Sequence, residues 1–224
     1  YRLGQEKVVA VDDVSLSLRE GEICCLLGTS GSGKSTLLYL MAGLERPSRG
    51  HIRVKGKRVD LMSEAQLALF RQGNIGFVFQ TYNLMPMLTA LENVALPLVF
   101  SGVPQGKRNR LAARMLKDVG LERFSNHRPS QMSGGQQQRV GIARAFVGRP
   151  SLVFADEPTG NLDSKTSREV MELILEMAAA HHQTLIFVSH DPEISSYADH
   201  IYVLLDGKIE QAIINRDTKQ EEEQ

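Results

Sequence analysis

The chain has 224 residues, of which 42% are apolar and 23% are charged, and its 26 basic residues are balanced by 26 acidic ones. This composition is that of an ordinary globular domain and argues against a disordered or fibrous chain. The lack of a basic excess argues against a nucleic-acid-binding protein. No apolar run in the sequence reaches the roughly 18–20 residues that span a bilayer.

The cysteines and the first residues bear on the surroundings of the protein. The only cysteines, Cys24 and Cys25, are neighbours within an apolar run. That position predicts small reduced core residues rather than a disulfide, as in a cytosolic protein. The sequence begins at Tyr1 and shows no secretory signal peptide. Because methionine is absent there, we expect further residues before Tyr1.

Two strands are predicted in the first part of the chain. Residues 9–18 alternate loosely between apolar and polar, which predicts a half-exposed strand. Residues 23–27 are continuously apolar and predict a buried parallel strand.

A glycine-rich loop follows this buried strand and precedes a helix that is predicted to run to about Leu44. Its pattern is G-x-x-x-x-G-K-S, formed by Gly28, Thr29, Ser30, Gly31, Ser32, Gly33, Lys34, Ser35 and Thr36. A phosphate-binding loop lies between a strand and a helix, as this loop does. The alternative is a flexible glycine-serine loop, which does not require a strand before it or a helix after it. We expect backbone N–H groups to hold a phosphate, Lys34 to reach the β- and γ-phosphates, and Ser35 to hold Mg²⁺. The sequence therefore predicts a site for a nucleoside triphosphate.

The next segments alternate strand and helix and then become helical. Residues 51–55 predict a strand, and Ser63 with Gln66 predicts the capping box of a short helix. Residues 75–79 predict a buried strand that ends at Gln80. Residues 82–146 show only helical periodicities and loops, which predicts a helical subdomain inserted into an α/β core.

The α/β pattern returns in the last third of the chain. Residues 152–157 and 184–188 predict buried strands, and Asp163 is placed to cap the helix between them. Residues 201–209 predict a hairpin, and residues 215–224 a polar tail with a disordered end. Strands separated by helices predict a mostly parallel sheet within one domain, residues 1–224.

Polar side chains follow three of the predicted strands. Ligands bind at the carboxyl ends of parallel strands, so Asp156 is the expected Mg²⁺ carboxylate and Glu157 the carboxylate that orients or deprotonates the attacking water. The alternative for this pair is an acidic loop that caps the next helix. His190 is either a γ-phosphate sensor or a structural histidine. Gln80 is either a ligand of Mg²⁺ or of the water, or an ordinary surface residue.

A second anion site is predicted at Ser133, Gly134, Gly135 and Gln136, which open a helix. Ser133 and Gln136 form a capping box, which alone explains the pair. Two glycines in a first turn, however, cost helix stability of about 1 kcal/mol each, and bare N–H groups at a helix N-terminus bind anions. Two phosphate sites for one triphosphate predict a head-to-tail homodimer in which each ATP lies between two chains.

Taken together and in order, these motifs resemble the Walker A, Q-loop, signature, Walker B, D-loop and H-loop of ABC-transporter ATPases, over nearly the whole chain. The resemblance implies a P-loop NTPase fold with a RecA-like, mostly parallel core, an N-terminal antiparallel β subdomain and the inserted helical subdomain. It also implies ATP and Mg²⁺ as ligands, with Glu157, His190 and Gln80 as catalytic residues and Ser35, Gln80 and Asp156 around the metal. Tyr1 resembles the aromatic residue that stacks on adenine, and Asp163 belongs to the D-loop.

The stretch around Asp156 is similar to the subfamily of LolD, MacB and FtsE. This resemblance implies a peripheral subunit on the cytoplasmic face of the membrane that drives a permease with an extracytoplasmic domain. The alternatives are an FtsE-like regulator that activates a cell-envelope partner without transport, and a soluble ABC ATPase. Residues 82–98, with Met85 and Met87, are either the permease docking groove or simply core.

Overall fold

The computed structural model describes residues 1–4 and 6–215. The predicted disordered end of the tail therefore lies outside the described residues. One six-stranded sheet organises the fold, in the order β10-β9-β3-β8-β7-β6. Its strands are β3 (Ile23–Leu27), β6 (Ile75–Val78), β7 (Leu152–Asp156), β8 (Thr184–Ser189), β9 (His200–Leu205) and β10 (Lys208–Ile214).

Neighbouring strands of this sheet are parallel except β9 and β10, which form the predicted hairpin. The predicted α/β class and mostly parallel core are thus confirmed. Because β3, β6, β7 and β8 run in the same direction, their carboxyl ends meet at one edge of the sheet. That edge receives the glycine loop, Gln80, Asp156 with Glu157, and His190.

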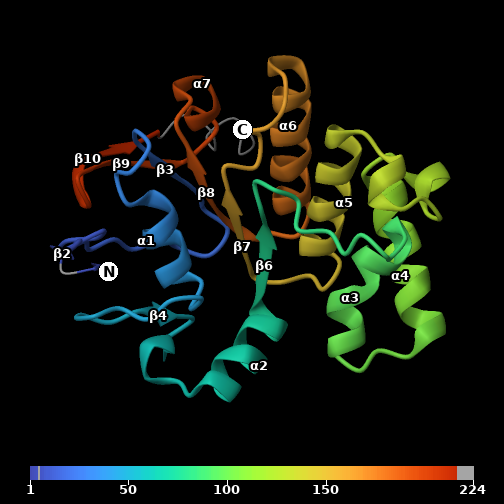
Figure 1. The fold of residues 1–224 in the computed structure, drawn as a ribbon, viewed down its shortest axis with the longest axis horizontal. Helices are drawn as coiled ribbons and strands as arrows, with labels where there is room; N and C mark the ends of the chain where they lie inside the picture. The colour runs from blue at the N-terminus through green and yellow to red at the C-terminus, as the bar shows by residue number, and fades with distance from the viewer. Residues whose placement is uncertain (5, 216–224) are drawn as a thin grey trace, which may run out of the picture.

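Helices cover both faces of the sheet. On one face, Cys24 and Leu26 of β3 pack with Leu38 of α1 (Lys34–Met41). On the other face, Cys25 belongs to the larger core with α5 (Gly134–Phe146), α6 (Ser164–Ala180) and the one-turn helix α7 (Pro192–Ser195). Successive strand residues point to opposite faces, so the two adjacent cysteines lie in different cores. Figure 1 shows α1 and α6 on opposite sides of β7 and β8.

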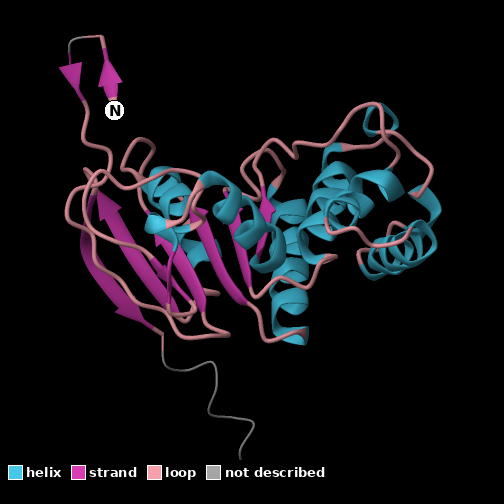
Figure 2. Ribbon diagram, turned by 90° about the horizontal axis from the view of Figure 1, so that it is seen from below, coloured by secondary structure: helices cyan, strands magenta, loops and turns pink. Residues whose placement is uncertain are grey.

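The segment between β6 and β7 contains three helices where helical periodicity predicts them: α3 (Ala90–Phe100), α4 (Gln105–Asp118) and α5. Short 3₁₀ turns at Glu122–Phe124 and Pro129–Gln131 lie between α4 and α5. Figure 2 shows the strands of the main sheet gathered at one end of the molecule and these helices at the other.

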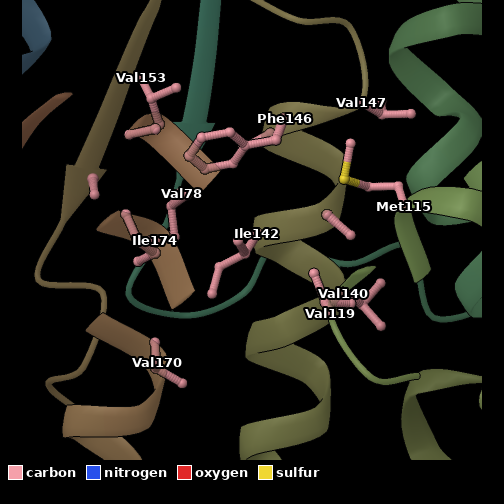
Figure 3. Close-up of a cluster of buried hydrophobic side chains, with 14 of the residues drawn as sticks. Val78, Met115, Val119, Val140, Ile142, Phe146, Val147, Val153, Val170 and Ile174 are labelled. Carbon is pink, nitrogen blue, oxygen red and sulfur yellow. The ribbon is translucent and has the colours of Figure 1, made fainter. Parts of the chain in front are cut away.

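Apolar side chains join the inserted helices to the sheet. Phe146 and Ile142 of α5 lie beside Val153 of β7, Val78 of β6 and Ile174 of α6 (Figure 3). These five side chains are at most 1% exposed. Close packing of this kind holds α5 firmly against β6 and β7, whose carboxyl ends lie at the edge that receives Gln80, Asp156 and Glu157.

The remaining strands are short antiparallel pairs, β1 (Arg2–Leu3) with β2 (Glu6–Lys7) and β4 (Arg53–Val54) with β5 (Lys57–Arg58). Helix α2 (Glu64–Asn74) begins at the predicted capping box, with Ser63 as its N-cap. A 3₁₀ turn, Val59–Leu61, precedes it.

The strand predicted at residues 9–18 is wrong, because the structure has no strand there. The alternating side chains Val14, Leu16 and Leu18 pack, half-buried, against the core on the α1 face. The backbone N–H of Asp12 donates to the carbonyl of Gly207 at 2.8 Å. The alternating apolar side chains of residues 9–18 are therefore buried by packing against the core, and the segment does not pair as a strand.

Candidate functional site

The glycine loop is shaped by contacts that exclude side chains. Gly33 is the N-cap of α1 with φ of 97°, and a Cβ there would lie 2.1 Å from the carbonyl oxygen of Ala10. A Cβ on Gly28 would lie 2.4 Å from the carbonyl oxygen of Leu204. Both positions therefore require glycine, for the left-handed backbone in the first case and for close approach of two backbones in both.

Polar groups inside the loop fit a phosphate. Lys34 is buried and its Nζ donates to the carbonyl oxygen of Thr29 at 2.6 Å. Burial lowers the pKa of this ammonium, while the nearby carboxylates of Glu157 and Asp156 act in the opposite direction. Among the described residues, the buried hydroxyl of Ser32 has no hydrogen-bond partner. A buried donor without a partner is costly, and a phosphate oxygen would satisfy it.

Asp156 ends β7 and receives two hydroxyl groups from α1. Ser35 Oγ donates to Asp156 Oδ1 at 2.8 Å, and Tyr39 Oη donates to Asp156 Oδ2 at 2.6 Å. Burial and the Asp156 carboxylate raise the pKa of the Tyr39 phenol. Since Ser35 donates its proton to Asp156, the lone pairs of its hydroxyl oxygen remain free for a cation. This pair of oxygen ligands suits Mg²⁺.

Glu157 lies between Gln80 and His190 at the carboxyl ends of the parallel strands. Its backbone is left-handed, with φ of 42°, which is strained for a residue with a side chain. Gln80 Nε2 donates to Glu157 Oε2 at 3.2 Å, and His190 Nδ1 lies 3.8 Å from Glu157 Oε1. The side chains predicted from three separate strands therefore meet around one carboxylate.

Tyr1 lies beside α1, near Thr36 in its first turn and Glu45 beyond its last. Its hydroxyl donates to Glu45, and Thr36 is also near the phenol. Partial burial and the Glu45 carboxylate raise the pKa of Tyr1. The ring is exposed, so it offers a flat apolar face beside the phosphate loop.

The glycine turn that opens α5 packs against side chains of two other segments. Ser133 is the N-cap of α5, and its Oγ accepts from the backbone N–H of Gln136 at 3.3 Å. A Cβ on Gly134 would lie 2.9 Å from Tyr82 Oη, and one on Gly135 would lie 3.1 Å from Thr166. The neighbours of this turn thus come from the Gln80 loop and from α6.

Asp163 caps α6, as the sequence predicts. Its carboxylate accepts from the backbone N–H of Thr166 at 3.1 Å and from the Thr166 hydroxyl at 2.6 Å. These hydrogen bonds lower the pKa of Asp163. Asp163 therefore lies near the turn that opens α5, since Thr166 also contacts Gly135 of that turn.

Three contributors were not predicted. Tyr39 stands four residues after Ser35, on the same face of α1, and that spacing could have identified it. Gly160 packs against Gln80 and Glu157, and Arg144 donates to the carbonyl oxygens of Tyr82 and Asn83 at 2.8 and 2.6 Å. These contacts join segments distant in sequence, and nothing in the local pattern indicates them.

A glycine loop between a buried strand and a helix, with carboxylates at the end of a neighbouring parallel strand, defines the class of phosphate-loop ATPases. The family model described as "ABC transporter" matches residues 11–160. The chain belongs to the ABC transporter family, as one of its ATP-binding proteins.

Relatives in sequence agree with this assignment. An uncharacterised ABC transporter ATP-binding protein of Thermotoga maritima is 48% identical over 210 residues, which cover 94% of this chain and 89% of that protein. The macrolide export ATP-binding/permease protein MacB of Chlorobaculum tepidum is 44% identical over 211 residues. That match covers 93% of this chain but 32% of MacB. The resemblance to the group that contains MacB is therefore confirmed.

Solved structures agree as well. The cassette MJ0796, as a dimer in a post-hydrolysis state bound to ADP and Pi, superposes with a TM-score of 0.88 at 40% identity. The aligned residues cover 96% of this chain and 94% of that one. In the part of the chain that the structure describes, no helix has both the length and the apolar character to cross a membrane.

Proposed function

We propose that the chain is the ATP-hydrolysing subunit of a membrane exporter, or of a mechanical signalling system of the MacB and LolD type, and works at the cytoplasmic face of the membrane. The observation that supports ATP hydrolysis most directly is that Gln80 and His190 both contact the carboxylate of Glu157, at the sheet edge that also bears the phosphate loop. In the relative MacB, the printed name joins an ATP-binding part and a permease in one protein.

ATP is held by the loop, and each residue has a separate task. The N–H groups of the loop and Lys34 bind the β- and γ-phosphates, and the ring of Tyr1 stacks on the adenine. Ser35 and Asp156, with Gln80 nearby, would hold Mg²⁺, which would supply positive charge to balance the charge that develops on the phosphate oxygens. The buried Ser32 hydroxyl supports this assignment, because it gains an acceptor when phosphate is bound.

Hydrolysis is an in-line displacement in which Glu157 serves as the base. Its carboxylate orients a water and accepts a proton from it as the water oxygen bonds to the γ-phosphorus. The bond between the γ-phosphorus and the bridging oxygen breaks, and that electron pair leaves with ADP. His190 donates a hydrogen bond to the γ-phosphate. The strained backbone of Glu157 supports this role, since such strain concentrates at functional sites.

The ATPase acts as a head-to-tail dimer. Ser133, Gly134 and Gly135 offer N–H groups and a hydroxyl at the positive end of α5, and their neighbours in this chain are Tyr82 and Thr166 rather than the loop. A second chain with two-fold symmetry brings each signature turn to the ATP held by the other chain. Two dimeric structures of MJ0796, both with TM-scores of at least 0.88, support a dimer in general.

The permease docks on the inserted helices. Met85 and Met87 are 52% and 73% exposed, so these two methionines are not core residues. A groove of about 350 Å³ between α3 and α4 begins at Leu88, the residue after Met87, and is lined by Leu91, Leu96 and Val99 among others. Methionine-rich surfaces adapt to partners of varied shape. Arg144 fixes the backbone of Tyr82 and Asn83, so movement of the docking surface reaches Gln80.

A second candidate function is that of an FtsE-like regulator, in which the same ATPase activates a cell-envelope partner and transports nothing. A soluble ABC ATPase is the third. Purification of the tagged chain from gently solubilised membranes separates them. A copurifying protein with membrane helices and a large external domain supports the proposal, and its external domain distinguishes transport from regulation. Recovery of the chain alone, or with ribosomes, would remove the membrane role and leave the ATPase.

A further inference from the structure

Tyr39 occupies a position that the proposed mechanism does not use. It lies in the second turn of α1, four residues after Ser35, so both side chains leave the same face of the helix. Both reach Asp156, Ser35 at Oδ1 and Tyr39 at Oδ2. Two donors on two different oxygens fix the rotation of a carboxylate, whereas one donor leaves it free to turn.

The phenol is held in place by aromatic packing. The ring of Tyr39 lies 5.9 Å from that of Phe77 in β6, centroid to centroid, and Phe77 packs in turn against Phe154 of β7 at 6.3 Å. Phe154 is fully buried. The hydroxyl therefore approaches Asp156 from a rigid aromatic stack, and a tyrosine has only two side-chain torsions to order. Its 2.6 Å hydrogen bond is in the range of charge-assisted bonds to a carboxylate.

We infer that Tyr39 is a positioning residue of the metal site: it holds Asp156 so that Oδ1 serves Ser35 and the cation. This inference rests on the proposed magnesium site. Partners behind a metal ligand orient it, and their loss commonly weakens metal affinity by about 10- to 100-fold. Tyr39 is tied to the cation through Asp156 and not to the phosphates, so its loss affects metal affinity and leaves metal-free nucleotide binding unchanged.

The test variant is Tyr39→Phe, which keeps the ring packing and removes only the hydroxyl. Tyr202→Phe is the matched control, since Tyr202 lies on β9, where it stacks on His200. Mn²⁺ replaces Mg²⁺ as the probe, and its binding to the full chain with saturating ADP is followed by electron paramagnetic resonance. Nucleotide affinity in excess EDTA and the melting temperature without ligand are measured on the same proteins.

The expected result for Tyr39→Phe is Mn²⁺ affinity on the order of tenfold weaker than in the wild type. Its ADP affinity in EDTA and its melting temperature stay near those of Tyr202→Phe. Unchanged Mn²⁺ affinity would overturn the inference, and so would an equal loss of metal-free ADP affinity, which would indicate a structural role. If Asp156→Ala binds Mn²⁺ as well as the wild type does, the proposed magnesium site itself is wrong.

Discussion

Gly160→Ala tests how closely the catalytic groups are packed. A Cβ on Gly160 would lie 2.8 Å from Gln80 Nε2 and 3.4 Å from Glu157 Oε2, and the backbone there needs no left-handed torsion. Carbon atoms rest at about 3.5 Å or more from their neighbours, so the Gln80 amide must move by roughly 0.7 Å. That shift breaks the 3.2 Å hydrogen bond from Gln80 to Glu157.

We expect Gly160→Ala to lower kcat and to leave the free energy of unfolding nearly unchanged. A positioned general base contributes roughly 10²- to 10⁴-fold to the rate, so a partial loss of its alignment lowers kcat by roughly 10- to 100-fold. The displaced group is the end of a flexible side chain, so the free energy of unfolding changes by about 1 kcal/mol or less.

Steady-state phosphate release and thermal melting measure the two effects. The control is Gly148→Ala, in another turn, where a Cβ would meet nothing within 4 Å. It should match the wild type in both measurements. Wild-type kcat in Gly160→Ala would refute the claim that Gln80 aligns Glu157, and a large fall in melting temperature would show that the added methyl group disturbs the fold instead.

Three further predictions concern helix caps. Ser133→Ala removes the cap of α5, which costs about 1 kcal/mol and lowers the melting temperature by about 2–4 °C. Ser133→Asp keeps a capping oxygen but adds a negative charge close to the expected phosphates. It should therefore melt at the wild-type temperature and fail to form the ATP-dependent dimer in analytical ultracentrifugation. If the dimer still forms, this turn does not contact the phosphates of the ATP held by the partner chain. The pKa of Asp163 is lowered in the folded state, so its stabilisation is complete above the unfolded pKa near 4 and is lost as pH falls through the lower folded pKa. Asparagine caps a helix but does not titrate. The melting temperature of Asp163→Asn should therefore fall less than that of the wild type between about pH 7 and pH 2, and an equal fall in both proteins would contradict this.

The clustering of Gln80, Asp156, Glu157 and His190 could be predicted because the carboxyl ends of parallel strands lie at one edge of a sheet. Once residues 23–27, 75–79, 152–157 and 184–188 are recognised as buried strands, the residues after them must meet at one edge. The capping boxes at Ser63 and Ser133 could also be predicted, because each depends only on two residues that are three positions apart in the sequence.

The features that the sequence did not reveal depend on tertiary contacts. Residues 9–18 alternate as a strand does, yet they lie on a core that α1 and β3 provide. Gly160 and Arg144 act on segments that are about 60 to 80 residues away in the chain. The spacing of Tyr39 from Ser35 places both on one face of α1, but its hydrogen bond to Asp156 becomes evident only in the structure.

The most direct test of the central claim is the association state of Glu157→Gln with and without ATP. The amide keeps the shape of the side chain but cannot accept the proton of the attacking water, so ATP is bound and not hydrolysed. Analytical ultracentrifugation at saturating ATP should then show a stable dimer that returns to monomer when ATP is removed. A variant that binds ATP but stays monomeric would contradict the two-chain site, and one that hydrolyses ATP at the wild-type rate would contradict the role of Glu157.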